Sequence, residues 1–309
     1  MKHRKIGVFL APLSLLLILA CSLPEIPRFN MNPSGGPSGR IIYVANESGN
    51  WEIYLMDLLK NKSIRLTNNT AEDYSPAYIP ALSKIGFVSD RGNGINVYTM
   101  NLDGSEQEVL FDKKVSLDYP DWSPDGKLIA ASYNEPCKEN SASCFFDLYI
   151  LDPVGFKTTQ LSKTKESEWV PQWSPDGQKI AFASDRNGDS EIYVINKDGS
   201  NLVQLTKNTG YDGRPRWSPD GLLIAFETDR EGGDWDIFIM NADGSDPHAI
   251  TSNTFSSDWM QSWSPDGKWL VYVSSKDGNN ELYIIDINGQ NQRVLTRNAY
   301  SDNSPVWIP

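Results

Sequence analysis

The sequence predicts an all-β fold: a six-bladed β-propeller whose blades are four-stranded antiparallel sheets. One pentapeptide, Trp-Ser-Pro-Asp-Gly, occurs four times, and two weaker versions of it flank these copies. The aromatic residues at its first position, which we call anchors, are spaced 44 to 51 residues apart, a period typical of repeated sheet units. The anchors are Tyr78, Trp122, Trp173, Trp217, Trp263 and Trp307.

The repeat that begins at Pro171 explains why one unit gives one blade. Alternating apolar residues predict strands at 171–174, 179–184, 191–196 and 202–206. Turn residues separate these strands; in the first turn, Pro175 fixes φ and Gly177 supplies a left-handed position. Four antiparallel strands in about 45 residues are typical of a propeller blade.

The two ends of the repeat region predict how the ring closes. The first repeat begins with a second strand at Ile41, and the chain ends with a first strand at Trp307. We therefore expect the C-terminal strand to complete the N-terminal blade, which would protect sheet edges from pairing with other chains. The propeller is assigned to residues 40–309.

The N-terminal residues predict export and membrane attachment. Residues 1–20 read as a signal peptide, because a basic start is followed by an apolar run too short to span a membrane. Ile18-Leu19-Ala20-Cys21 resembles a bacterial lipoprotein cleavage site, with Cys21 as the lipid attachment residue, although Leu19 differs from the usual small residue. An uncleaved signal anchor is the alternative. Residues 21–39, rich in Pro, Gly and Ser, read as a flexible tether.

The cysteines and the net charge indicate where the protein is located and which classes of partner it can bind. Cys137 and Cys144 lie in the longest repeat, and we expect a disulfide that closes an inserted loop; two unpaired thiols are the alternative. The formal net charge of −12 repels phosphate backbones, which argues against nucleic acid as a partner. The expected location is extracytoplasmic, lipid-anchored to the cell membrane, either in the periplasm or on the outer surface.

The repeat resembles a known family. The motifs at 171–177 (Pro-Gln-Trp-Ser-Pro-Asp-Gly), 180–186 (Ile-Ala-Phe-Ala-Ser-Asp-Arg) and 192–199 are similar to the WD-like propeller repeat of the TolB type. The resemblance covers residues 40–309 and implies the six-bladed fold, but not the activity of TolB. TolB proteins carry a separate domain before the propeller, whereas only the tether is expected here. Some serine peptidases use the same repeat with a catalytic domain after it.

Several repeated residues are interpreted as structural. The anchors are expected to pack between neighbouring blades, with a role as ligand platforms as the alternative. Arginines in the turn between second and third strands are expected to pair with an acid that begins the third strand, Arg186 with Glu191 and Arg230 with Asp236. The alternative is a charged binding ring. The Asn-x-Asp-Gly-Ser turns are interpreted as turn chemistry and not as calcium loops.

Acids recur just before the anchors. An acid stands five residues before the anchor in five repeats (Asp73, Glu168, Asp212, Asp258 and Asp302), and Asp118 stands four before in the sixth. In one interpretation each acid accepts hydrogen bonds from the backbone of its own loop. In the other, the acids converge at the channel mouth and hold a basic peptide segment or a cation such as Ca²⁺. The metal candidates are Asp73, Asp212, Asp258 and Asp302.

Aromatic and basic residues share these loops and suggest a binding face. Arg214 and Arg216 are the strongly basic residues among them, so the site would be locally polarised. Aromatic residues beside charges suit recognition of a protein or a sugar. The ligand-binding candidates are Tyr74, Asp118, Tyr119, Glu168, Trp169, Tyr211, Asp212, Arg214, Asp258, Trp259 and Asp302.

The sequence favours a binding function over catalysis. Beyond the signal peptide it has one histidine, His248, predicted near the outer rim, which argues against a Ser-His-Asp triad and a histidine metal site. We expect a non-enzymatic, monomeric scaffold without a cofactor that recognises an envelope protein or a glycan. One alternative is a carboxylate-dependent glycan hydrolase or lyase; pectin lyases built on such propellers, by resemblance, need a histidine-rich metal centre. The other is a structural envelope component without a specific ligand.

Overall fold

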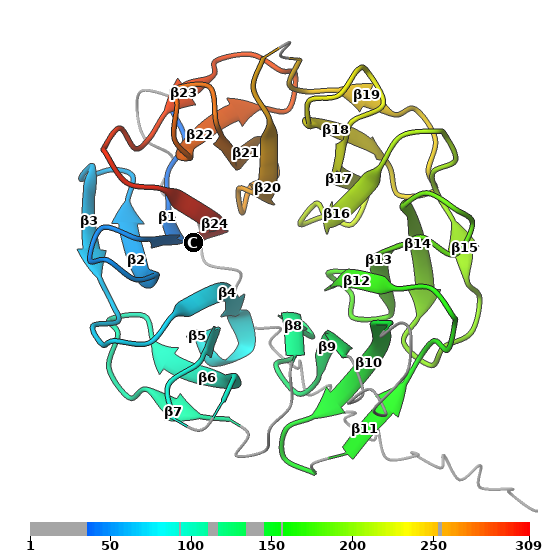
Figure 1. Ribbon diagram of the computed structural model, residues 1–309, viewed down its shortest axis with the longest axis horizontal. Coiled ribbons are helices and arrows are strands. Elements are labelled where there is room, and N and C mark those ends of the chain that lie inside the picture. Colours follow the sequence, from blue (N-terminus) through cyan, green and yellow to red (C-terminus); the bar gives the residue numbers. More distant parts are fainter. Residues whose placement is uncertain (1–35, 93, 111–116, 134–144, 156, 253–254) are drawn as a thin grey trace, which may run out of the picture.

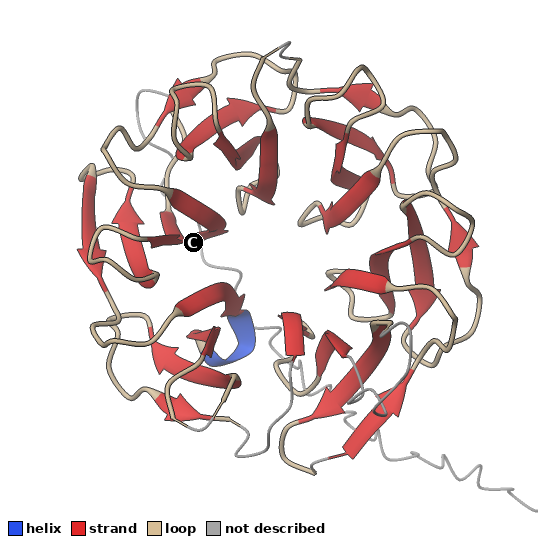
Figure 2. Cartoon of the chain, viewed as in Figure 1, coloured by secondary structure: helices blue, strands red, loops and turns tan. Residues whose placement is uncertain are grey.

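The protein is a ring of six antiparallel sheets around a central axis (Figure 1). The computed structural model describes residues 36–92, 94–110, 117–133, 145–155, 157–252 and 255–309. Strands dominate the ring, and the helix drawn in Figure 2 is the short 3₁₀ turn η1 (Pro80–Leu82). The prediction of an all-β, six-bladed propeller is confirmed.

Within each blade, the four strands are named below in order from the innermost, at the channel, to the outermost, at the rim. Blade 1 consists of β24 (Asp302–Ile308), β1 (Arg40–Ala45), β2 (Glu52–Asp57) and β3 (Lys62–Arg65). Blade 2 consists of β4 (Asp73–Ile79), β5 (Lys84–Ser89), β6 (Asn96–Asn101) and β7 (Glu108–Val109). Blade 3 consists of β8 (Leu117–Trp122), β9 (Ile129–Tyr133), β10 (Asp147–Asp152) and β11 (Lys157–Gln160).

The remaining blades follow the same order. Blade 4 consists of β12 (Glu168–Trp173), β13 (Lys179–Ser184), β14 (Glu191–Asn196) and β15 (Val203–Gln204). Blade 5 consists of β16 (Asp212–Trp217), β17 (Leu223–Thr228), β18 (Asp236–Asn241) and β19 (His248–Ala249). Blade 6 consists of β20 (Asp258–Trp263), β21 (Trp269–Ser274), β22 (Glu281–Asp286) and β23 (Arg293–Val294).

Several expectations for the chain lie outside the described residues. They concern the signal peptide 1–20, most of the tether 21–39, the lipid attachment at Cys21 and the Cys137–Cys144 disulfide. Within the described ranges, the structure contains no helix of the length and apolar character needed to cross a membrane.

The ring closes by pairing the two ends of the propeller. β24 lies antiparallel to β1, with Trp307 opposite Ile41, so the C-terminal strand is the innermost strand of the N-terminal blade (Figure 1). The guanidinium of Arg40 also donates to the carbonyl oxygen of Pro309, with an Nη2–O distance of 3.0 Å. The predicted closure is confirmed, and blade 1 depends on chain segments separated by the whole ring.

The anchors fill the wedges between blades. Each anchor tryptophan is at most 7% exposed and packs into a cluster with residues of the preceding blade. Trp173 packs with Ala130, for example, and Trp217 packs with Ala181. Large flat rings contribute much buried apolar area at such a junction. The interpretation of the anchors as packing residues is confirmed.

Small residues in the preceding blade make room for these rings. One equivalent position of the second strand shares a cluster or a contact with the following anchor. It holds Gly86, Ala130, Ala181, Ala225 and Val271 in blades 2 to 6. Gly86 is the extreme case, because a Cβ built there would lie less than 3 Å from the ring of Trp122. At the junction between blades 2 and 3, the ring of Trp122 therefore occupies the space that a side chain at position 86 would need.

We predict that Gly86→Ala destabilises the propeller by about 1–3 kcal/mol, because the added methyl overpacks the junction. The smaller ring of Trp122→Tyr should relieve part of that clash. Urea unfolding of the two single variants and the double variant measures the coupling between the two sites. Equal losses from Gly86→Ala in both backgrounds would contradict the volume match.

We predict that deleting residues 305–309 lowers the melting temperature and broadens the transition, because blade 1 loses half of β24 and its anchor Trp307. Removing a buried tryptophan alone costs about 3–5 kcal/mol. Calorimetry on the shortened chain measures the effect. Removal of Pro309 alone is the comparison, because it loses the carbonyl oxygen that accepts from Arg40 but keeps Trp307. A shortened chain that melts like the parent would show that closure contributes little.

Candidate binding face

Every innermost strand contains a β-bulge three residues before its anchor. The bulged residues adopt left-handed backbone conformations with φ between 45° and 55°, although none of them is glycine. They are Ser75, Tyr119, Val170, Arg214, Met260 and Ser304. Positive φ is uncommon for such residues, and bulges redirect side chains near functional sites. The recurrence in all six blades makes this a property of the repeat.

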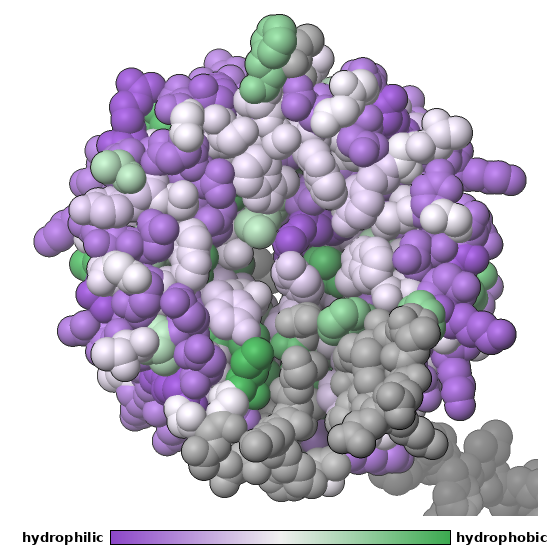
Figure 3. Space-filling model, in the orientation of Figure 1, coloured by the Kyte–Doolittle hydropathy of each residue, from purple (hydrophilic) through white to green (hydrophobic). Residues whose placement is uncertain are grey.

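A central cavity of about 450 Å³ lies inside the ring of bulges. Ser75, Tyr119, Arg214, Met260 and Ser304 line one end of it. We call this end, with the loops that enter the innermost strands, the inlet face. Residues immediately before the anchors line the middle of the cavity, and prolines such as Pro219 and Pro265 line the far end. Figure 3 shows a polar outer rim, with both polar and apolar residues around the central opening.

Residues immediately before the anchors also join neighbouring blades. Asp121 Oδ2 accepts the main-chain N–H of Trp173 at 2.7 Å. Gln172 Oε1 accepts that of Trp217 at 2.5 Å. Burial raises the pKa of Asp121 to about 6, while Arg216 and the N–H of Trp173 oppose the rise. The middle of the cavity is thus lined by side chains that also hold the ring together.

Blade 5 carries charges that the other blades lack at matching positions. Arg214 donates to Tyr119 Oη at 2.9 Å, and its guanidinium lies 4.7 Å from the centre of that ring. It also forms an ion pair with the buried Glu227, at 3.4 Å. Glu227 in turn accepts the main-chain N–H of Met260 at 2.6 Å. Burial raises the pKa of Glu227, and Arg214 opposes the rise. The network fixes three bulges, from blades 3, 5 and 6, relative to one another.

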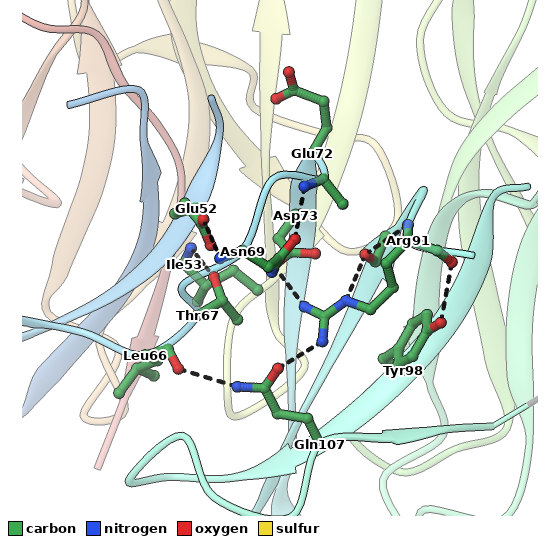
Figure 4. Close-up of polar contacts among 12 residues, drawn as sticks. Glu52, Ile53, Leu66, Thr67, Asn69, Glu72, Asp73, Arg91, Tyr98 and Gln107 are labelled. Carbon is green, nitrogen blue, oxygen red and sulfur yellow. Dashed lines mark hydrogen bonds and ion pairs between the residues drawn. The ribbon is translucent and has the colours of Figure 1, made fainter. Parts of the chain in front are cut away.

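The acids five residues before the anchors lie inside the blades. Figure 4 shows Asp73 between the amide of Asn69 and the guanidinium of Arg91, with Oδ2 at 2.7 and 2.6 Å from the donor nitrogens. Arg91 also donates to Gln107 and lies 4.8 Å from the centre of the Tyr98 ring. The acid therefore fastens the loop before its own strand to the next turn of the same blade.

Two predicted ion pairs are corrected. Arg186 binds Glu168 and Arg230 binds Asp212, the latter at 2.6 Å, instead of the acids that begin the third strands, Glu191 and Asp236. The physical reason is register: Glu168 lies opposite Ser184 in the sheet, and this pairing places the turn that follows Ser184 beside the carboxylate. Burial raises the pKa of Glu168 to about 7 even though Arg186 opposes the rise.

The five acids therefore do not gather at the channel mouth. Asp73, Glu168, Asp212, Asp258 and Asp302 are at most 1% exposed, each within its own blade, and none of them is among the described lining of the central cavity. Across the described ranges, no group of three or more His, Cys, Asp or Glu side chains could hold a metal ion. Asp118 lies on β8, and its side chain is outside the description.

The aromatic candidates are half-buried on the inlet face. Tyr119, Trp169, Tyr211 and Arg214 share a second pocket of about 250 Å³. Tyr211 also packs on Trp235, with ring centres 4.4 Å apart, and burial raises its pKa to about 12. Tyr74 and Trp259 lie on blades 2 and 6 and are not among the residues that line this pocket. The structure thus brings four of the predicted ligand-binding residues together.

Sequence reasoning missed other residues of this face. Ser75, Val170, Met260 and Ser304 occupy the same bulge position as Tyr119 and Arg214. A signal was present, because proline follows the bulged residue in five of the six repeats, and proline inside a strand marks a bulge or an edge. Glu227 was also missed; it is a charged residue at a strand position that holds Val88, Ala183 and Val273 in other blades.

Comparison with known proteins assigns the chain to a family. Residues 21–149 and 120–309 match the family described as TolB beta propeller domain. The chain belongs to this family. A Protein TolB homolog from Chlorobium luteolum is 29% identical over 267 residues, covering 86% of this chain and 59% of that protein. A Protein TolB homolog from Chlorobium chlorochromatii is 40% identical over 206 residues, covering 67% of this chain and 45% of that protein. The chain thus spans about half the length of these curated relatives.

Solved structures share the architecture of this TolB-family propeller. TolB from Acinetobacter baumannii superposes with a TM-score of 0.73 at 22% identity, over 87% of this chain and 66% of that one. An oligogalacturonate lyase in complex with manganese superposes with a TM-score of 0.60 at 17% identity, over 84% of this chain and 75% of that one. At these identities the likenesses show the fold alone.

We predict opposite effects from two equivalent substitutions in this TolB-family propeller. Burial raises the pKa of Asp302 from 3.8 to about 6, and the nearby Glu281 carboxylate adds to the rise. The native state thus binds the Asp302 proton more tightly than the unfolded chain, so this carboxyl destabilises the fold as pH rises from about 4 to about 6. Asp302→Asn removes that penalty, and its stability should exceed that of wild type by about 2 kcal/mol at neutral pH.

The control is Asp212→Asn, where the carboxylate pairs with Arg230. That change leaves a partly buried guanidinium without its partner and should cost about 3 kcal/mol at neutral pH. Chemical unfolding at about pH 4 and about pH 7 measures both variants. A loss of stability in Asp302→Asn at neutral pH would contradict the prediction.

Proposed function

We propose that this chain is a non-enzymatic extracytoplasmic scaffold that recognises a protein partner at its inlet face. The observation that carries the proposal is the set of bulges, five of which hold side chains that differ between blades (Ser75, Tyr119, Arg214, Met260 and Ser304) around one cavity mouth. Function commonly resides in variable residues held by an invariant scaffold. A lipid on Cys21, with residues 21–39 as a tether, would keep the scaffold near the membrane.

Composition of the inlet face supports a protein partner. Half-buried Trp169 and Trp259 offer large apolar surface with a polar edge, and Arg214 adds a charge whose position is fixed by Glu227. Tryptophan, tyrosine and arginine contribute most to protein–protein affinity. A curated relative from Desulfosudis oleivorans, 32% identical over 77 residues, is named Tol-Pal system protein TolB, which also favours a protein-binding role.

The buried acids argue against carboxylate catalysis. Glu168, with its raised pKa, has the protonation behaviour of a general acid, but its side chain is fully buried and bound to Arg186. A catalytic acid must reach the substrate atom that it protonates. The likeness to the lyase concerns the fold alone, so we put forward no catalytic function.

The test removes two aromatic side chains of the inlet face. In the double variant Trp169→Ala and Trp259→Ala, we expect binding of envelope proteins captured by the wild-type chain to weaken by about 100-fold, because two contact tryptophans are lost. Crosslinking in intact cells followed by identification of the captured protein supplies the partner for the affinity measurement.

The matched control is Leu222→Ala, an exposed apolar residue in the turn between β16 and β17, on the opposite face of the ring. It should bind the partner as wild type does. Unchanged affinity in the folded double variant would place recognition elsewhere on the molecule. Capture that depends on Leu222 and not on the tryptophans would assign it to the opposite face.

A further inference from the structure

The ring has a second face, opposite the inlet face, which we call the outlet face. It is formed by the turns that join the first to the second strand and the third to the fourth strand of each blade. Neighbouring strands of a blade are antiparallel, so these turns lie at the same edge of the sheets. Five aliphatic side chains in these turns, one in each of blades 1 to 5, are 45–87% exposed: Leu59, Leu82, Val154, Leu202 and Leu222.

Two of these side chains stand where other blades have an acid. The position two residues beyond the third strand holds an aspartate in blades 2, 4 and 5 and an apolar residue in blades 1 and 3: Asp103, Asp198, Asp243, Leu59 and Val154. Each of the three aspartates accepts the main-chain N–H of a serine in its turn at 2.9 Å. In blades 1 and 3 the turn is instead fastened by Asp57 and Asp152, which accept the main-chain N–H groups of Leu59 and Val154. The turn therefore has no need of an apolar side chain there.

Leu222 departs from the repeat in a similar way. The residue after the glycine of the Pro-Asp-Gly turn is Lys127 in blade 3, Gln178 in blade 4 and Lys268 in blade 6. In blade 5 the same position holds Leu222, which is 67% exposed. An exposed leucine where the repeat otherwise places a polar residue gives the fold no buried contact. Apolar side chains gathered on one face mark an interaction surface.

The chain enters the propeller at this same face. The carbonyl oxygen of Ser38 accepts the indole N–H of Trp307 at 3.0 Å. The carbonyl oxygen of Gly39 accepts the main-chain N–H of Leu58 at 3.2 Å. The residues just before the propeller therefore lie beside the turn that carries Leu59.

This entry point places the predicted lipid attachment on the side of the outlet face. Residues 36–39 are the described end of the predicted tether 21–39. A chain with the length of the segment from Cys21 to Gly36 spans at most about 50 Å when fully extended. A lipid on Cys21 would therefore hold the outlet face close to the membrane.

Lysines on the outlet face fit the polar surface of a membrane. Lys60 pairs with Asp57 at 2.8 Å and Lys127 pairs with Asp125 at 3.4 Å, and these lysine side chains are 76% and 78% exposed. A lysine can lay its aliphatic stem along apolar groups and keep its ammonium among lipid phosphates. Aliphatic tips beside lysines are the combination that binds the boundary between headgroups and acyl chains.

We propose that the outlet face rests on the lipid surface that carries the Cys21 anchor, and that the inlet face is thereby directed away from that surface toward its protein partner. This inference rests on the lipid attachment in the proposed function and adds a second, direct contact with lipid. Each turn contact is weak, but the anchor keeps the face at a high effective concentration near the membrane. A few such contacts then suffice to orient the ring.

The test uses the chain purified from membranes with its own N-terminus, and mass spectrometry verifies the lipid on Cys21. The chain is placed in nanodiscs of phosphatidylethanolamine and phosphatidylglycerol that contain a gadolinium-chelating lipid. Its leucine, valine and methionine methyls carry ¹³C, and gadolinium removes the NMR signals of methyls near the headgroups. We expect the signals of Leu82, Val154 and Leu202 to be lost and that of Met260, on the inlet face, to persist.

Leu59→Ser combined with Leu222→Ser should weaken the lipid contact by about tenfold, because two aliphatic side chains are removed from it. The gadolinium-induced relaxation at Val154 should fall accordingly. The matched control is Ile64→Ser combined with Val109→Ser, at residues 45% and 46% exposed on the outermost strands of blades 1 and 2. The control should relax as wild type does, and melting curves establish that both double variants are folded.

Several results would overturn the inference. Equal relaxation at Met260 and Val154 would show that no face is preferred, and an unchanged effect in the variant with serine at 59 and 222 would assign the orientation to the tether alone. Loss of the same signals in gadolinium-free discs as protein concentration rises would assign the face to a second copy, and loss on addition of the captured partner would assign it to that partner. A chain without a lipid on Cys21 lacks the attachment that the inference requires. Partner capture that still depends on Trp169 and Trp259 would leave recognition at the inlet face standing in each case.

Discussion

The packing of each anchor ring into the preceding blade is the contact on which the ring depends. A tryptophan from one innermost strand fills the space above a glycine, an alanine or a valine of the blade before it. The next blade repeats the arrangement. Because blade 1 takes its innermost strand from the C-terminus, this contact and the β24–β1 pairing together close the circle. Bulges, buried acids and the cavity all take their positions from this packing.

Repetition supplies an internal comparison that separates structural residues from candidate functional ones. Buried acids, turn arginines and anchors recur, and the structure gives each a role inside a blade or between blades. Arg214, Arg216 and Glu227 break the pattern within one blade, and two of them face the cavity. Residues that a repeat does not need for folding are those that can be selected for binding.

The sequence predicted the strands and blades of the propeller more fully than the residues of the inlet face. In blade 4 the middle strands lie where alternation placed them, at 179–184 and 191–196, because both are buried between neighbours. The innermost strand begins at Glu168 and not at 171, since the bulge at Val170 interrupts the alternation. The same bulge sets the register that brings Arg186 to Glu168. Contacts that depend on register between strands cannot be read from spacing along one strand.

The bulges also have a consequence for how such a protein can diversify. The same left-handed backbone is held with serine, tyrosine, valine, arginine and methionine at that position, so the surrounding sheet imposes the geometry and the side chain does not. The five bulge sites that line the cavity can therefore change chemistry without a change in backbone path. Propellers built from this repeat can thus differ in what they bind while they keep the same backbone.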